Sequence, residues 1–188
     1  MNYILRPAAT LFITAVIVIA LLSVVYTLTL DPIEKQKQKT QEAAMKEVLP
    51  GVSEFKPIPF DNTGGIIAVY RGVSNNTTAG FVVQVSREGY SGSIDLIVGI
   101  SASSETITGM RVLRHSETPG LGALAVKKDF YSRYDNKALI PLGVVRTSPG
   151  ENEIQAITSA TITTRAVTRA VNEAIDWYLH AGREEAIK

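Results

Sequence analysis

Hydroxyl side chains crowd the point where a short β-like run, Glu153–Ile157, passes into a helix. The hydroxyl residues that follow the run are Thr158, Ser159, Thr161, Thr163 and Thr164. From Val167 onward the apolar residues recur on one face, which is typical of an amphipathic helix. The first turn of a helix has free backbone amides and the positive end of the helix dipole, so it favours an anion such as a phosphate. Serine and threonine are also ordinary helix caps, and on this stretch alone a structural role is the simpler interpretation.

A second stretch, Arg114–Gly122, mixes ionisable residues with a Pro-Gly-Leu-Gly run. It lies at the end of a predicted strand and leads into a predicted helix. Its glycines would let backbone amides approach a ligand closely. The alternative is a tight turn preceded by solvated polar residues.

The composition excludes several kinds of site. Cysteine is absent, and the two histidines, His115 and His180, lie far apart in the sequence. Disulfides, iron–sulfur ligation and thiolate metal sites are therefore excluded, and no metal site is predicted. The basic residues are scattered and the net charge is +1, which predicts no nucleic-acid interface. Redox or transfer chemistry would have to come from a cofactor or from oxygen-bearing side chains.

An uncharged stretch near the N-terminus predicts a membrane anchor. After a short lead at 1–6, residues 7–30 carry no charge. At about 1.5 Å per residue, a helix of this length spans roughly 36 Å, enough for a ~30 Å hydrocarbon core. A cleavable signal would have a shorter apolar region and a small-residue cleavage site, and a buried core helix is the other alternative. Residues 31–50 are rich in helix formers and end at Pro50-Gly51, which predicts a helical stalk.

The remainder of the chain, 51–188, predicts one α+β domain. It starts with irregular linking structure that includes a turn at 61–65. Alternating β-branched runs, separated by turns such as 74–77, predict strands at 66–70, 80–85, 94–100 and 106–114. Because the connections are short, antiparallel pairing is expected. A helix is predicted at 121–134 and a further strand at 144–147.

Together the two unusual stretches resemble the covalent FMN-binding domain family. A strand leading into His115–Gly122, followed by a β-run, Thr158–Val167 and an amphipathic helix, is most similar to the G subunits of Rnf ion-translocating electron-transport complexes. The C subunits of sodium-translocating NADH:quinone reductases are related. The resemblance runs from the N-terminal anchor to the last helix. It implies a single transmembrane helix followed by an antiparallel-sheet FMN-binding domain with flanking helices.

The flavinylation motif of that family reads roughly Asp-x-x-[Ser/Thr]-Gly-Ala-Thr, and its last threonine carries FMN through a phosphoester. The resemblance therefore implies that Thr161 carries covalent FMN, with Thr158 at the hydroxyl position and Ala160 at the alanine. Arg165 is expected to add a counter-charge for the phosphate.

Two positions depart from the motif. Ser159 stands where glycine is usual, and this exchange of one small residue for another is expected to be tolerated. Gln155 stands where the acid is usual. If the modifying enzyme reads that carboxylate, flavinylation would be slow or incomplete unless Glu153 substitutes.

The resemblance also implies that the His115–Gly122 loop lies near the flavin ring. The implied cofactor-binding residues are Thr161, Thr158, Ser159, Ala160, Thr163, His115, Glu117, Thr118, Gly120, Leu121 and Gly122. No catalytic residue is expected. For His115 two roles stay open: a contact with the ring or the phosphate, or the ordering of the loop.

By this resemblance the chain is a membrane-anchored flavoprotein subunit that relays electrons in an Rnf-type complex, rather than a complete enzyme alone. The implied partners are the other membrane, iron–sulfur and flavin subunits, a flavin transferase during maturation, and membrane lipid. The alternative is an extracytoplasmic FMN-domain regulatory or structural membrane subunit without a relay role.

The orientation of the anchor is ambiguous from charge. Arg6 precedes the span, whereas Lys35, Lys37 and Lys39 follow it, so the count slightly favours a cytoplasmic domain. The family's domains face outward. The expectation is therefore a single-pass protein of the cell (inner) membrane with an extracytoplasmic C-terminal domain.

Overall fold

The computed structural model describes residues 2–60, 64–74 and 77–187. The turns predicted at 61–65 and 74–77 include residues 61–63 and 75–76, which lie outside the described residues. The chain divides into two compact units, one ending at Gln41 and the other beginning at Glu42.

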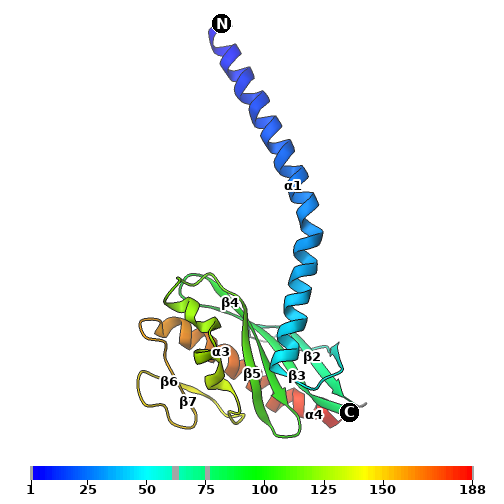
Figure 1. Cartoon of the computed structure of the whole chain (residues 1–188), viewed down its shortest axis with the longest axis vertical. Helices are drawn as coiled ribbons and strands as arrows, with labels where there is room; N and C mark the ends of the chain where they lie inside the picture. The colour runs from blue at the N-terminus through cyan, green and yellow to red at the C-terminus, as the bar shows by residue number, and fades with distance from the viewer. Residues whose placement is uncertain (1, 61–63, 75–76, 188) are drawn as a thin grey trace. The chain divides into compact units, whose positions relative to one another are not determined.

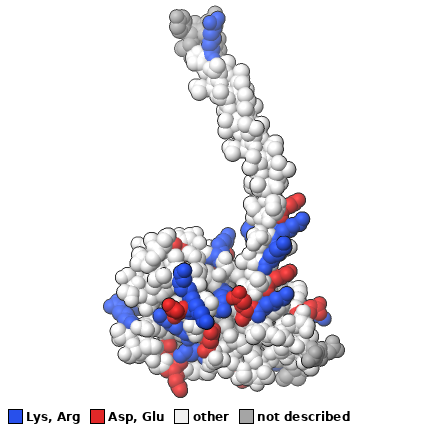
Figure 2. Space-filling model, viewed as in Figure 1, with Lys and Arg blue, Asp and Glu red and all other residues white. Residues whose placement is uncertain are grey.

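The first helix, α1 (Asn2–Val48), runs without interruption through the predicted anchor and stalk. Within the described residues, it is the one helix long and apolar enough to cross a membrane. Its large apolar side chains from Leu11 to Leu30 are exposed, which excludes the alternative of a helix buried in the chain's own core. Figure 2 shows this stretch free of charged residues on the face in view. The hydroxyl of Thr14 bonds back to the carbonyl of Thr10, which leaves no free donor on that side chain.

Five antiparallel strands form one sheet in the second unit, in the order β1-β2-β3-β4-β5 (Figure 1). The strands are β1 (Glu54–Pro57), β2 (Ile66–Ser74), β3 (Thr77–Glu88), β4 (Ser93–Ser101) and β5 (Thr106–Arg114). Each strand pairs with its neighbour in sequence, so the predicted α+β class and antiparallel pairing are confirmed. The irregular structure predicted for the linking segment was wrong at β1. This short edge strand has polar or charged neighbours around its one apolar anchor, Phe55, and so lacks the alternation that reveals a strand.

Different elements cover the two faces of the sheet. The long helix α3 (Thr161–Trp177) packs with the main core on one face. Along β3, Phe81 and Val83 join this core, whereas Val82 points to a second cluster on the opposite face. The second cluster contains Met45, Val48, Leu49, Val82 and Ile97, of which the first three come from the end of α1 and the residue after it.

A glycine in the sheet allows the end of α1 to come this close. A Cβ built on Gly99 of β4 would lie 2.2 Å from the carbonyl oxygen of Val48. The hydroxyl of Thr108 on β5 donates a hydrogen bond to the same oxygen. The last turn of α1 is therefore packed as part of the second unit, consistent with that unit beginning at Glu42.

The segment predicted as one helix at 121–134 is broken. It forms three short turns: η1 (Gly122–Val126), α2 (Lys128–Tyr131) and η2 (Ser132–Tyr134). Lys127 has an extended backbone (φ −82°, ψ 146°) and separates the first two turns. The prediction of a continuous helix was wrong because the buried anchors Ala125, Phe130 and Tyr134 lie on separate turns, and their spacing does not follow one helical face.

Two short strands, β6 (Gly143–Val145) and β7 (Glu153–Gln155), pair in parallel as a second, two-stranded sheet. Asn172 of α3 holds the residue before β6, because its side chain accepts from Leu142 N at 2.9 Å and donates to Leu142 O at 3.0 Å. A short turn then connects β7 to the start of α3. Beyond α3 the chain continues through η3 (Tyr178–Gly182) and α4 (Arg183–Ile187).

Candidate functional site

A tight turn at Ile157–Ala160 joins β7 to α3. Its ends are linked by a 3.0 Å hydrogen bond from Ala160 N to Ile157 O. The buried hydroxyl of Thr164 braces both ends, because it accepts from Ile157 N at 3.0 Å and donates to Ala160 O at 3.1 Å. Thr161 follows directly as the first residue of α3.

The start of α3 presents backbone amides. The first helical hydrogen bond runs from Thr164 N to Ala160 O at 3.1 Å. The amides of Thr161, Ile162 and Thr163 come before it and therefore have no acceptor within the helix. Ala160 occupies the N-cap position, and alanine has no side-chain acceptor for these amides. The turn thus leaves a place for an external anion beside the Thr161 hydroxyl.

The backbone at Ser159 explains why its position favours glycine. Ser159 has φ +62°, in the left-handed region that residues with a Cβ adopt at a cost of about 1 kcal/mol or more. Serine in place of glycine at position 159 therefore adds backbone strain as well as a side chain. Serine can occupy the position, but with less conformational ease than glycine.

The Glu117 side chain connects its own loop to two other segments, the β3–β4 turn and the start of α3. Its side chain is 5% exposed. One carboxylate oxygen accepts from the amides of Tyr90 at 2.8 Å and Ser91 at 3.0 Å, both in the turn between β3 and β4. The other oxygen accepts from the hydroxyl of Thr163 on α3 at 2.5 Å. The loop, the hairpin turn and the helix start are thereby joined through one side chain.

The hydrogen bonds keep Glu117 ionised despite its burial. Burial by itself raises the pKa of the Glu117 carboxyl. The hydrogen bond from Thr163 and those from the Ser91 and Tyr90 amides oppose burial, and His115 adds an electrostatic contribution in the same direction. Together they place the pKa below its ordinary value of 4.5.

Two glycines make room for this carboxylate. A Cβ on Gly122 would lie 2.3 Å from Glu117 Oε2 and 2.6 Å from Thr163 Oγ1. A Cβ on Gly89 would lie 2.5 Å from Glu117 Oε1. Since these distances are shorter than any non-bonded contact, either side chain would displace the carboxylate from its partners.

A cavity of about 380 Å³ lies between the loop and the start of α3. It is lined by Tyr90, Glu117, Thr118, Leu121, Gly122, Ser159, Ala160, Thr161, Ile162 and Thr163. The structure thus brings eight of the residues implied by the resemblance to one cavity. Tyr90 was missed by sequence reasoning, and Ile162 was expected to contribute its amide but not its side chain. An aromatic residue inside a glycine-flanked hairpin turn was the available signal for Tyr90.

Three of the implied residues, Thr158, His115 and Gly120, do not line the cavity. Thr158 is exposed on the turn before α3. His115 Nδ1 accepts a 3.2 Å hydrogen bond from Glu117 N, which is a contact within the loop. Gly120 has φ +78° and lets the loop reverse direction.

The structure also places Gln155, the Glu153 that could substitute for the missing acid, and Arg165. Glu153 accepts from Gly150 N at 2.9 Å, so its carboxylate is engaged in the turn before β7. The backbone oxygen of Gln155 accepts from Arg133 at 2.5 Å. Arg165 is exposed on α3 and does not line the cavity.

The cavity has the volume and the mixed polar and apolar lining of a small-molecule site. Its volume lies within the range of small-molecule sites, roughly 300–1,000 Å³. Amides and hydroxyls gather at the α3 end, around Thr161. Among the lining residues, Tyr90 is 71% exposed, Ile162 53% and Leu121 41%, so large exposed side chains border the cavity.

Comparisons with known proteins identify the family of the chain. Residues 89–176 match the FMN-binding domain family, and residues 1–48 match the RnfG N-terminal region. The chain is 35% identical over 179 residues to the G subunit of the ion-translocating oxidoreductase complex of Methanosarcina acetivorans, covering 92% of this chain and 93% of the relative. It is 33% identical over 183 residues to the G subunit of the Na⁺-translocating ferredoxin:NAD⁺ oxidoreductase complex of Acetobacterium woodii, covering 89% and 88%.

The fold is also that of a solved relative. The C subunit of the Na⁺-translocating NADH-quinone reductase from Parabacteroides distasonis superposes with a TM-score of 0.60 at 16% identity, covering 80% of this chain and 95% of that one. The resemblance drawn from the sequence is confirmed: the chain belongs to the family of G subunits of ion-translocating oxidoreductase complexes and contains an FMN-binding domain.

Proposed function

We propose that the chain is the membrane-anchored flavoprotein subunit of an Rnf-type ion-translocating complex and carries FMN joined to Thr161 through a phosphoester. One observation carries the proposal. The Thr161 hydroxyl lies at the start of α3, beside amides without helical acceptors, on the wall of a cavity with an apolar rim.

Each part of the cavity suits one part of FMN. A phosphodiester on Thr161 would keep about one negative charge, which the amides of Ile162 and Thr163 and the helix dipole would stabilise. The exposed apolar side chains of Tyr90, Leu121 and Ile162 would cover the flavin ring. Bound flavin supplies one- and two-electron transfer, and this chain's residues bind and orient it.

Membrane attachment and partners follow from the family. Homologous G subunits are parts of multi-subunit complexes, one of them described as a ferredoxin:NAD⁺ oxidoreductase. We place the folded unit on the extracytoplasmic side of the cell membrane, anchored by α1, with electrons passing between its FMN and flavin or iron–sulfur centres of neighbouring subunits. A covalent link would prevent loss of the cofactor on that side. A flavin transferase would make the link during maturation.

The attachment is tested by flavin fluorescence on a denaturing gel. The full chain is produced with its flavin transferase as wild type, Thr161→Ala and Thr158→Ala. Thr158 is the matched control, because it is an exposed threonine in the same turn but outside the cavity. We expect fluorescent wild-type and Thr158→Ala bands and a dark Thr161→Ala band. A fluorescent Thr161→Ala band would refute the attachment site.

Absence of fluorescence from every band would direct attention to Gln155. The Gln155→Asp variant would then restore the acid of the motif, and a fluorescent band would assign the block to Gln155. A band that stays dark would favour the alternative of a regulatory or structural subunit.

The relay role is tested separately. The isolated flavinylated protein should bleach reversibly with dithionite and oxidise no NADH. Rapid NADH oxidation by this protein alone would argue against a relay. Full activity of a complex carrying Thr161→Ala would favour a structural role instead.

A further inference from the structure

We infer that Glu117 is a positioning residue for the flavin: its carboxylate holds the rim of the site, at Tyr90, in place against the attachment helix, at Thr163. The inference rests on the proposed function, because it concerns the same cavity. It assigns Glu117 a role through its hydrogen bonds to protein groups instead of direct contact with the ring.

The three partners of Glu117 come from segments that are distant in sequence. Tyr90 and Ser91 belong to the β3–β4 turn, and Thr163 belongs to the first turn of α3, two residues after Thr161. Tyr90, Glu117 and Thr163 all line the cavity. The carboxylate is thus a direct bridge between the most exposed wall of the cavity and the helix that carries the attachment residue.

Burial makes these bonds decisive for the geometry. Glu117 is 5% exposed and Thr163 is 1% exposed, so water cannot readily replace either partner. Gly89 and Gly122 flank the two carboxylate oxygens, and a side chain at either glycine position would clash with the carboxylate. The packing around Glu117 is therefore arranged for a carboxylate in this one position.

Removing the carboxylate should loosen the rim while leaving the attachment chemistry possible. Thr161 directly follows the turn at Ile157–Ala160, and the bonds of Thr164 that stabilise this turn do not involve Glu117. Loss of Glu117 would release the Tyr90 and Ser91 amides and free the Thr163 hydroxyl. The ring would then be held less uniformly although the phosphoester could still form.

The test uses the full flavinylated chain in detergent as wild type, Glu117→Ala and Glu117→Gln. Glutamine is the matched control, because its oxygen can accept from both amides and its amide can donate to the Thr163 hydroxyl. Hydrogen exchange of the Tyr90 and Ser91 amides and the visible circular dichroism of the flavin are measured. We expect Glu117→Ala to exchange at least about tenfold faster at these amides and to change the dichroism, and Glu117→Gln to stay near wild type.

Each other outcome overturns the inference. Wild-type exchange and dichroism in Glu117→Ala would show that the carboxylate holds nothing. A Glu117→Gln protein as loose as Glu117→Ala would assign the effect to charge and not to the three bonds.

A second pair of variants covers misfolding of Glu117→Ala. Thr163→Val removes only the helix-side bond, and Thr163→Ser keeps the hydroxyl. The inference requires faster exchange at Tyr90 and Ser91 in the valine variant alone, and equal exchange in the two variants refutes it. If neither wild type nor Gln155→Asp carries covalent flavin, the proposed function fails, whereas hydrogen exchange on the flavin-free chain still decides the role of Glu117.

Discussion

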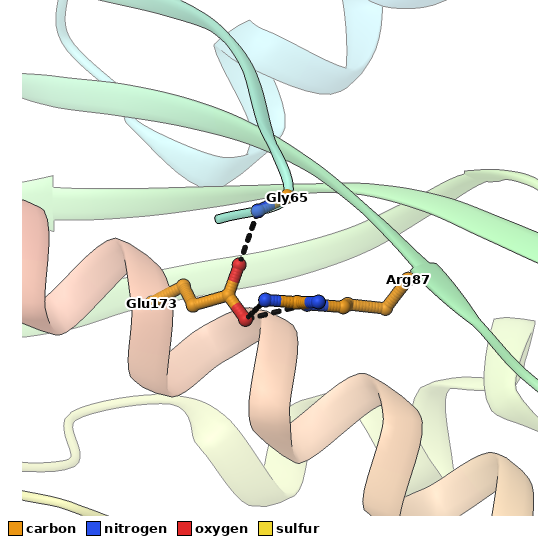
Figure 3. A network of polar contacts seen from close by, with 3 residues as sticks. All are labelled: Gly65, Arg87 and Glu173. Carbon is orange, nitrogen blue, oxygen red and sulfur yellow. Dashed lines mark hydrogen bonds and ion pairs between the residues drawn. The ribbon is translucent and has the colours of Figure 1, made fainter. Parts of the chain in front are cut away.

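The two ends of α3 are tied to the rest of the fold by one carboxylate each, and the two ties differ in chemistry. At the N-terminal end, Glu117 accepts from two backbone amides and a hydroxyl, all of them neutral donors. Toward the C-terminal end, Glu173 accepts from the Arg87 guanidinium and from Gly65 N at 2.8 Å (Figure 3). One tie is a buried hydrogen-bonded group, and the other is an ion pair near the surface.

Because of this difference, we expect stability and site geometry to depend more on Glu117 than on Glu173. Each hydrogen bond to a charged, buried group contributes about 1.5–3 kcal/mol to stability. A buried donor left without its acceptor also destabilises the fold. Arg87 and Glu173 are 38% and 21% exposed, so solvent and salt weaken their attraction. The buried tie lies at the candidate cofactor cavity, whereas the solvent-screened tie lies toward the other end of the helix.

Gly122→Ala should have the largest effect, because it forces a methyl group against Glu117 Oε2 and Thr163 Oγ1. We expect a loss of about 2–3 kcal/mol in the free energy of unfolding, measured by urea titration. Gly120→Ala is the control. Gly120 has φ +78° but no atom within 4 Å of a built Cβ, so its substitution reports backbone strain alone, about 1 kcal/mol. Equal losses in the two variants would argue against the buried tie.

Thr164→Val should follow, with a loss of about 1–3 kcal/mol, since it leaves the buried Ile157 amide without its hydroxyl acceptor. The Thr164→Ser protein keeps the hydroxyl and should lose less. Covalent flavin yield, read from gel fluorescence, should fall in the valine variant as the attachment turn loosens. A valine variant as stable as wild type would show that the turn holds without this brace.

Acidification should weaken the contribution of Glu117 to stability. The pKa of Glu117 is lowered in the folded protein, so its contribution to stability is present above the unfolded value and is lost as the pH falls below 4.5 through the folded value. Unfolding free energies measured across this range should therefore decline less steeply in Glu117→Gln than in wild type. An unchanged slope in Glu117→Gln would contradict the assignment.

The ion pair of Arg87 with Glu173 should give the smallest effect. A double-mutant cycle with Arg87→Met and Glu173→Gln is expected to yield a coupling of about 0.5–1 kcal/mol, reduced at high salt. The Gly65 amide stays paired in the arginine variant, which isolates the guanidinium contribution. A coupling above about 2 kcal/mol would show that the Arg87–Glu173 ion pair stabilises the fold as much as the hydrogen bonds of Glu117.

Local patterns were sufficient for much of the fold, whereas the role proposed for the turn before α3 came from the family resemblance. The strands at β2 to β5 were predicted because β-branched residues alternate along them, and α3 was predicted because its apolar residues recur on one face. The Thr158–Thr161 stretch and the His115–Gly122 loop were found because their residue types are unusual at an element boundary. Patterns failed at β1 and in the 122–134 segment. There a few buried residues determine the structure, and the apolar residues show no helical or strand periodicity.

The sequence by itself determined strands β2 to β5 and helix α3 to within a few residues, the apolar anchor, and the family to which the two motifs belong. Only the tertiary structure decided that Glu117 bridges the β3–β4 turn and α3, that Tyr90 forms the rim of the cavity, and that the last turn of α1 packs against the sheet at Gly99. The reason is physical. Propensity and periodicity act over neighbouring residues, whereas a buried carboxylate finds its partners through the folding of strands and helices that the sequence keeps 26 to 46 residues apart.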